Sequence, residues 1–149
     1  MIKLARTDSK NSDFIKLVQQ LDDDLAKRDG EEHDFYDQFN KLDQIKHTVV
    51  AYKNGIPLGC GAIKLFDTTQ VEVKRMFVLP EARGQGIATN IIIELEKWAG
   101  ELDFDKCILE TGIRQPEAIS LYEKRGYKVV PNYGQYIGVA NSICFEKKL

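Results

Sequence analysis

Residues 83–88, Arg-Gly-Gln-Gly-Ile-Ala, join a segment typical of a β-strand to a segment typical of a helix. The strand is predicted at 71–78, and Pro80 ends its pairing because proline lacks a backbone N–H. The helix is predicted from an apolar stripe at helical spacing, formed by Ile87, Ile91, Leu95 and Trp98. Gly100 is expected to end it. The glycine loop therefore lies at the start of a long helix.

Two interpretations fit this loop: a tight turn, or a backbone cradle for a phosphate. A helix start leaves N–H groups unsatisfied and carries partial positive charge, and Gly84 and Gly86 let a ligand come close to the backbone. Arg83 can add a charge-assisted hydrogen bond. A dinucleotide fingerprint needs glycine or alanine where Thr89 stands, and the ATP-type loop needs a Gly-Lys-Ser/Thr that the sequence lacks. Spacing alone leaves turn and cradle equally weighted.

The remaining segments predict a mixed α/β fold. Alternation or apolar runs indicate strands at 2–7, on both sides of Asn54-Gly55, and at 106–111, 127–130 and 142–148. Apolar spacing indicates a helix capped by Ser12 and ended by Gly30, a shorter one at 31–45 through Phe35, Phe39 and Leu42, and one at 116–125. The order β-α-α-β-β-β-α-β-α-β-β predicts a mixed sheet with helices on its faces.

Composition limits the classes of function. The 149 residues, with 43% hydrophobic and 30% charged, are expected to form one domain over 1–149. A net charge of −2 gives no electrostatic reason for a nucleic-acid partner, and no apolar run approaches the roughly 18 residues of a membrane span. No signal peptide is recognisable. Cys60, Cys107 and Cys144 each lie in an apolar run, which suits buried thiols and a cytoplasmic protein.

Two motifs together resemble the GCN5-related N-acetyltransferases. Residues 78–92 resemble the acetyl-CoA signature Gln/Arg-x-x-Gly-x-Gly/Ala, matched here by Arg83, Gly86 and Ala88. Residues 110–129 resemble the family's second signature, usually Asn-x-x-Ala-x-x-Leu-Tyr-x-Lys-x-Gly-Phe. The matching residues there are Ala118, Leu121, Tyr122, Lys124 and Gly126, with Tyr127 in place of phenylalanine and Gln115 in place of asparagine. The two motifs occur in the family's order, on the expected elements.

The resemblance implies a fold and a donor. The implied fold is a splayed, mostly antiparallel sheet with helices on both faces, and acetyl-CoA between the strand ending at Val78 and the strand at 107–111. The family uses this thioester without a metal. Its pantetheine is expected on Met76, Phe77, Val78 and the amide of Gln115. Its pyrophosphate is expected on the amides of Gly84, Gln85, Gly86, Ile87, Ala88 and Thr89, which agrees with the cradle interpretation.

Acetyl transfer to an amine needs a base for the ammonium and an acid for the departing thiolate. Glu72 matches the position of a general base in some family members. By the strand period of two it is expected to share a face with Lys74, Met76 and Val78. The alternative is a solvent-facing carboxylate paired with Lys74. Tyr122 matches the family's tyrosine beside the thioester sulfur; the alternative is a core tyrosine beside Leu121. The oxyanion donor is expected near Phe77 or Val78.

Other residues have less specific interpretations. His33 and His47 are interpreted as surface histidines and Cys107 as a core residue. The acidic runs 22–24 and 31–32 can attract a cationic acceptor or be solvated helix ends, and Tyr133 and Tyr136 can line the acceptor pocket or simply pack. The predicted activity is direct acetyl transfer to the primary amine of a small molecule. A protein N-terminus or lysine as acceptor, and an acyl-CoA sensor without catalysis, stay open. A homodimer through the exposed final strands is also considered.

Overall fold

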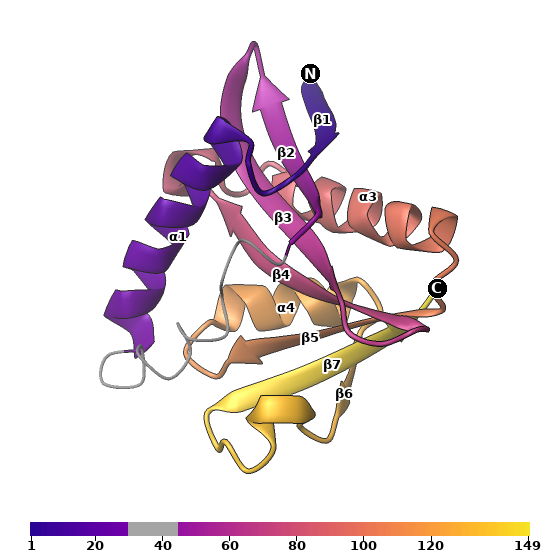
Figure 1. Ribbon diagram of the computed structural model, residues 1–149. Helices are drawn as coiled ribbons and strands as arrows, with labels where there is room; N and C mark the ends of the chain where they lie inside the picture. The colour runs from indigo at the N-terminus through magenta and orange to yellow at the C-terminus, as the bar shows by residue number, and fades with distance from the viewer. Residues whose placement is uncertain (30–44) are drawn as a thin grey trace.

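A seven-stranded sheet runs through the molecule, in the order β1-β2-β3-β4-β5-β7-β6 (Figure 1). The structure, a computed structural model, describes residues 1–29 and 45–149. The strands are β1 (Ile2–Thr7), β2 (His47–Lys53), β3 (Ile56–Leu65), β4 (Gln70–Val78), β5 (Lys106–Gly112), β6 (Lys128–Val130) and β7 (Ser142–Lys148). The helix predicted at 31–45, including Phe35, Phe39 and Leu42, lies outside the described residues apart from its last position. His33 and the 31–32 pair also lie outside them.

The sheet opens at its centre. All neighbouring strands are antiparallel except β4 and β5, which are parallel. These two pair only where Gln70 to Glu72 meet Lys106 to Ile108, although β4 continues to Val78 and β5 to Gly112. Beyond the paired residues the two strands diverge. The predicted splayed, mostly antiparallel sheet is therefore confirmed.

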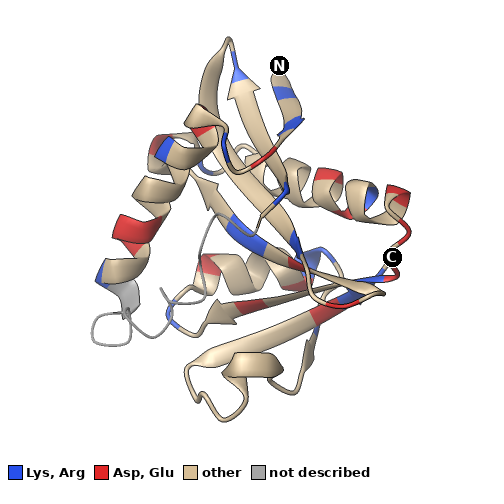
Figure 2. Ribbon diagram, in the orientation of Figure 1, with Lys and Arg blue, Asp and Glu red and all other residues tan. Residues whose placement is uncertain are grey.

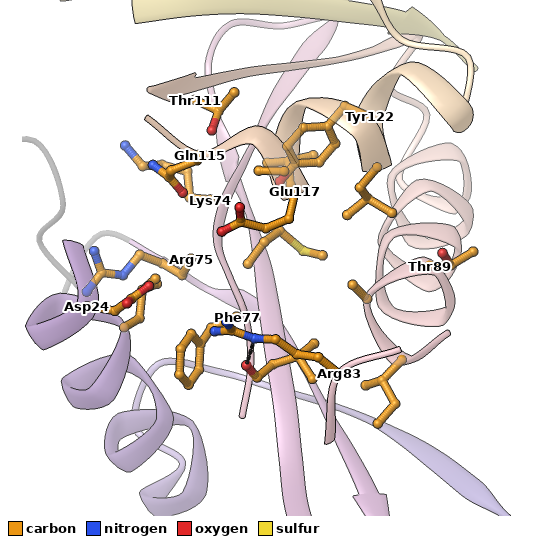
Figure 3. A pocket seen from close by; sticks show the side chains of 18 of the residues that line it. Asp24, Lys74, Arg75, Phe77, Arg83, Thr89, Thr111, Gln115, Glu117 and Tyr122 are labelled. Atoms are coloured by element: carbon orange, nitrogen blue, oxygen red, sulfur yellow. Dashed lines mark hydrogen bonds between the residues drawn. The ribbon is translucent and has the colours of Figure 1, made fainter. Parts of the chain in front are cut away.

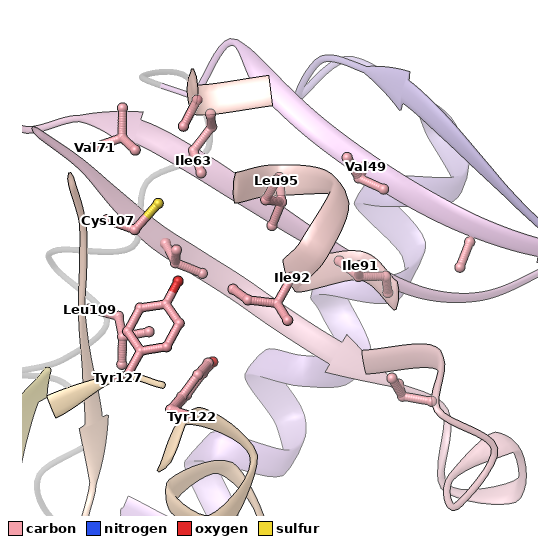
Figure 4. Close-up of a cluster of buried hydrophobic side chains, with 14 of the residues drawn as sticks. Val49, Ile63, Val71, Ile91, Ile92, Leu95, Cys107, Leu109, Tyr122 and Tyr127 are labelled. Carbon is pink, nitrogen blue, oxygen red and sulfur yellow. The ribbon is translucent and has the colours of Figure 1, made fainter. Parts of the chain in front are cut away.

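Helices cover both faces of the sheet, as predicted (Figure 1). On one face, Phe14 and Val18 of α1 (Ser12–Asp29) pack against Cys60 and Phe77. On the other face, α3 (Ile87–Glu101) and α4 (Pro116–Lys124) share a larger apolar cluster with the sheet (Figure 4). The predicted α3 stripe is confirmed: Ile87, Ile91 and Leu95 are buried and Trp98 packs at its edge.

Two helix boundaries differ from prediction. The N-cap of α1 is Asn11 rather than Ser12, because the Asn11 side-chain oxygen accepts a hydrogen bond from the Phe14 N–H at 2.9 Å. Gly100 does not end α3, which continues to Glu101. The left-handed residue after that helix is Asp103, with φ of 67°, so the glycine is not needed to reverse the chain. Gly30, the predicted end of α1, is not among the described residues.

A β-bulge in β4 changes which side chains share a face. Cys60 pairs with Phe77 and Ala62 pairs with Lys74, so Arg75 and Met76 together lie opposite one residue of β3. Arg75 takes a left-handed φ of 60°. Before the bulge, Val71 and Val73 lie in the cluster on the α3 face, so Glu72 and Lys74 lie on the α1 face. After it, Met76 and Val78 contact the α3-face cluster and Phe77 the α1-face cluster. The prediction that Glu72 and Lys74 share a face with Met76 and Val78 is wrong.

The sheet edges also bear on the predicted dimer surface. β1 and β6 are the two edge strands, whereas β7 lies between β5 and β6 and is paired on both sides. Of the final strands, only the three-residue β6 offers a free edge. Within the described part of the chain, no helix combines the length and the apolar character needed to cross a membrane.

Candidate active site

A cavity of about 370 Å³ lies where β4 and β5 diverge (Figure 3). Its walls come from both faces of the sheet: α3 and α4 on one side, α1 on the other. The predicted site residues that line it are Glu72, Met76, Phe77, Val78, Arg83, Gly84, Gly86, Ile87, Ala88, Thr89, Gln115 and Tyr122. Gln85 is exposed and does not line it. The cavity thus connects the glycine loop to both predicted catalytic side chains through the gap in the sheet.

The glycine loop forms one end of the cavity. Gly84 and Gly86 have φ of 82° and 78°, and Gly86 is the N-cap of α3 with no side-chain cap. Only glycine adopts this backbone without strain. A Cβ built on either glycine would meet no atom within 4 Å, so open space lies above the loop. The first-turn amides of α3 at Ile87 to Thr89 have no carbonyl partner within the helix. The arrangement suits an anionic ligand.

Arg83 is held at the junction of the loop and β4. Its Nε donates a hydrogen bond to the Val78 carbonyl oxygen at 2.9 Å, and its guanidinium lies 5.7 Å from the centre of the Phe77 ring. Leu79 N–H bonds back to the Leu58 carbonyl of β3. Because N–H groups alternate in direction along a strand, the Val78 N–H and carbonyl face the gap between β4 and β5. Backbone groups of β4 are therefore presented to the cavity.

Tyr122 lies on the α4 side of the cavity. Its side chain packs against Tyr127 and Phe145, with ring centres 5.7 and 6.1 Å away (Figure 4). Burial raises the pKa of the phenol, and the nearby Glu110 charge raises it further. The hydroxyl therefore stays protonated at neutral pH. The two interpretations from sequence are compatible, because this tyrosine both packs in the core and lines the cavity.

Glu72 is buried rather than solvent-facing, with 6% of the residue exposed. One carboxylate oxygen accepts a hydrogen bond from the Tyr133 hydroxyl at 2.6 Å, and the other lies 3.9 Å from Lys74 Nζ. Burial, and secondarily the Glu72 charge, raises the pKa of Tyr133, which keeps it a donor. Burial lowers the pKa of Lys74, and the Glu72 carboxylate opposes that shift. The alternative predicted from sequence, a solvent-facing carboxylate paired with Lys74, is wrong about the exposure of Glu72 and right about its pairing with Lys74.

Several residues that line the cavity were not among the site residues predicted from sequence. Lys74, Arg75, Glu110 and Thr111 all line the wall. Glu110 and Thr111 end the strand that borders the gap, and that position was the available signal. Arg75 could not be placed, because the bulge that turns it has no signature in the alternation. Asp24 and Tyr136 also line the cavity, whereas Tyr133 contributes through its bond to Glu72.

The remaining candidates lie away from this chemistry. His47 is only partly exposed and stacks edge-on against Trp98 at 4.9 Å, so it is less exposed than predicted. Burial lowers its pKa, as does the neighbouring Lys46. Cys107 is a core residue, as predicted, and Cys60 and Cys144 are also buried free thiols. Among the described residues, no cluster of histidine, cysteine and carboxylate side chains has the arrangement of a metal site.

Residues 14–127 match the family model described as the Acetyltransferase (GNAT) family, and the chain belongs to that family. Its relatives include an IAA acetyltransferase of Azospirillum brasilense, 32% identical over 99% of this chain and 98% of that protein. A Klebsiella pneumoniae protein assigned as an acyl-CoA N-acyltransferase superposes with a TM-score of 0.83 at 27% identity, over 100% and 98% of the two chains.

A GNAT protein of Elizabethkingia anophelis, solved with acetyl-CoA bound, has a TM-score of 0.73 at 18% identity, covering 99% and 98% of the chains. At this identity the likeness concerns the fold. The family predicted from the two sequence motifs is confirmed, and with it an acyltransferase of the GNAT type.

Proposed function

We propose that this protein transfers an acetyl group from acetyl-CoA to the primary amine of a small molecule, by direct attack and in the cytoplasm. The observation that carries the proposal is a continuous cavity that passes through the gap between β4 and β5. It joins a helix N-terminus on one side to two buried proton-transfer groups, Glu72 and Tyr122. The family membership, and the acetyl-CoA found in the Elizabethkingia relative, support the donor.

The donor would be held by backbone groups. The amides from Gly84 to Thr89 would bind its pyrophosphate, with added charge from Arg83. The pantetheine arm would lie along Met76 to Val78 of β4, where the Val78 backbone groups face the gap. Gln115 lies at the N-cap of α4 on the opposite wall and can bond the same arm. These residues supply orientation, since an amine and a thioester held together react far faster than in free solution.

The reaction needs a balanced movement of protons. Glu72 removes a proton from the ammonium, directly or through water, and the amine nitrogen then attacks the thioester carbon. The N–C bond forms, and the C–S bond breaks after a tetrahedral intermediate. The Val78 N–H faces the gap and is our candidate donor to the oxyanion. Tyr122 gives its proton to the departing thiolate, which leaves as the CoA thiol. The nitrogen loses its second proton as the amide forms, and that proton returns through solvent to the Tyr122 phenolate, while Glu72 releases its proton to solvent. No covalent intermediate on the protein is needed.

Thermal unfolding with and without acetyl-CoA is the primary test. Acetyl-CoA at 100 times its dissociation constant should stabilise the folded protein by about 2.7 kcal/mol, because only the folded state binds it. ATP and NAD serve as controls and should shift the transition much less. No shift in folded protein would make the loop a simple turn. A shift without CoA release across a broad amine panel would favour the sensor alternative.

Replacing Glu72 tests the proposed base. Glu72→Gln keeps the shape of the side chain and should lower kcat about 100-fold, the ordinary contribution of a general base. The acetyl-CoA-induced thermal shift should persist. Glu146→Gln is the matched control, since Glu146 is also a strand carboxylate paired with a lysine, Lys106 at 3.1 Å, and does not line the cavity. Unchanged kcat in Glu72→Gln would leave this carboxylate as only a structural partner of Lys74 and Tyr133.

A further inference from the structure

Arg75 is a buried cation with few hydrogen bonds to the part of the chain that the structure describes. Only 2% of its side chain is exposed, and it lines the cavity on the α1 side. Nη2 donates to an Asp22 carboxylate oxygen at 2.7 Å. Its Nε and Nη1 are buried and have no hydrogen-bond partner within residues 1–29 and 45–149. A guanidinium stays charged at any physiological pH, and a buried N–H without an acceptor is unfavourable.

The bulge gives this arginine its position. Without it, position 75 would lie on the face opposite Lys74, whereas the left-handed φ of 60° turns Arg75 to the α1 face, where it meets Asp22. Figure 3 shows Arg75 reaching from β4 towards α1, beside Asp24. A non-glycine residue with this φ is strained, and strained residues are found preferentially at ligand and active sites. The backbone conformation of Arg75 lowers local stability, which favours a role for Arg75 in ligand binding.

The two Arg75 nitrogens that lack a partner among the described residues lie away from the proposed position of the donor's phosphates. The glycine loop binds on the α3 face, whereas Arg75 is joined to α1. A group held by Arg75 therefore belongs to the acceptor. Figure 2 shows acidic positions on α1 and β5. Asp24 on α1, Glu72 on β4 and Glu110 on β5 line the cavity, together with the cation Lys74. These carboxylates favour an ammonium and oppose a doubly charged phosphate, but they leave Arg75 able to hold a single carboxylate.

We infer that the acceptor is an amine that carries a carboxylate, such as an amino acid, with its carboxylate on Arg75 and its amine directed towards Glu72. This inference rests on the proposed function and names the substrate class of the same cavity. Arg75 is then a specificity-determining residue. Asp22 holds the guanidinium in place through the hydrogen bond at 2.7 Å.

The test compares amino acids with their primary amides as acceptors, using CoA release at saturating acetyl-CoA. The panel spans one to five carbons between amine and carboxylate. An α-amide keeps the reacting amine and lowers its basicity, so amine protonation alone favours the amide. In the best pair, kcat/KM for the acid should exceed that for the amide at least tenfold. In Arg75→Gln the ratio should fall to about one, while the acetyl-CoA thermal shift persists.

Arg125→Gln is the matched control. Arg125 also has a buried Nε without a hydrogen-bond partner among the described residues, but it does not line the cavity. Its acid-to-amide ratio should equal that of the unmodified protein, and a ratio near one in this variant too would overturn the assignment to Arg75. If Arg75→Gln fails to fold, an inhibition experiment on the unmodified protein still tests the inference. Butyrate, a carboxylate without an amine, should inhibit competitively against an acceptor whose only charged group is its amine, and no inhibition would overturn the inference.

Failure of the carboxylate inference and failure of the acetyltransferase function would give different experimental results. Equal turnover of acids and amides by the unmodified protein would overturn the carboxylate inference and leave the acetyltransferase function intact. No thermal shift with acetyl-CoA, together with no CoA release from any amine, would overturn the proposed function and the inference with it. Preference for acids that is retained in Arg75→Gln would assign carboxylate recognition to another residue.

Discussion

Tyr122→Phe is expected to lower kcat about 100-fold while acetyl-CoA binding is retained. The phenol is the proposed acid, and a positioned acid typically contributes a factor of 100 to 10,000. Burial and Glu110 both raise the pKa of Tyr122, so the proton is present throughout the neutral and mildly alkaline range. The loss should therefore be constant across that range. Steady-state kinetics at several pH values, with thermal shifts for acetyl-CoA, provide the measurement.

Tyr127→Phe is the matched control for this variant. Tyr127 contacts Tyr122 edge-on with ring centres 5.7 Å apart, is buried to a similar degree and does not line the cavity. The GNAT signature that the sequence resembles has phenylalanine there. Removing its hydroxyl should leave kcat within about twofold of the unmodified protein. If Tyr122→Phe behaves in the same way as Tyr127→Phe, the phenol at position 122 has no acid role.

Gly86→Val is expected to weaken acetyl-CoA binding at least tenfold, as measured by the acetyl-CoA concentration that gives half of the thermal shift. Valine is strained at a φ of 78°, so the loop would change its backbone and turn the α3 amides away from the phosphates. The branched side chain would also occupy the open space above the loop. A tenfold loss corresponds to about 1.4 kcal/mol of binding free energy.

Gly138→Val separates ligand binding from backbone strain. Gly138 has φ of 80° and open space around it, as Gly86 has, but it lies in the exposed segment before β7 and outside the cavity. Both variants should lose stability by similar amounts in the absence of ligand. Only Gly86→Val should lose affinity for acetyl-CoA. Equal affinities in the two variants would identify residues 83–88 as a turn with no part in donor binding.

The elements with strong local patterns were predictable from sequence. The α3 stripe, the Asn54-Gly55 hairpin and the strands on either side of the gap all have a clear period, and the structure confirms them. The two GNAT motifs identified the family, and that resemblance implied that the glycine loop and Tyr122 lie at one donor site. The hairpin, the α3 stripe and each motif taken by itself depend on patterns within a few residues of the chain, which is where sequence is informative.

The features that escaped prediction depend on one backbone irregularity or on distant contacts. Arg75 is not glycine, so its left-handed φ had no signal, yet it reverses the faces of Met76 and Val78 relative to Glu72. Tyr133 bonds to Glu72 across 61 positions of sequence. Such a pair is decided by the packing of the late loop against β4. Sequence could name both tyrosines of that loop but not their partners.

The burial of the cysteines determines how activity can be followed. Burial raises the pKa of the Cys60 and Cys107 thiols to about 12 and that of Cys144 to about 11. Thiolates are the species that react with disulfide reagents, so the folded protein presents almost no competing nucleophile. A colorimetric thiol reagent added to the reaction will therefore report released CoA with little background. A slow rise in colour in protein alone, with neither acetyl-CoA nor acceptor added, would instead signal unfolding, so this control reports on the integrity of the fold.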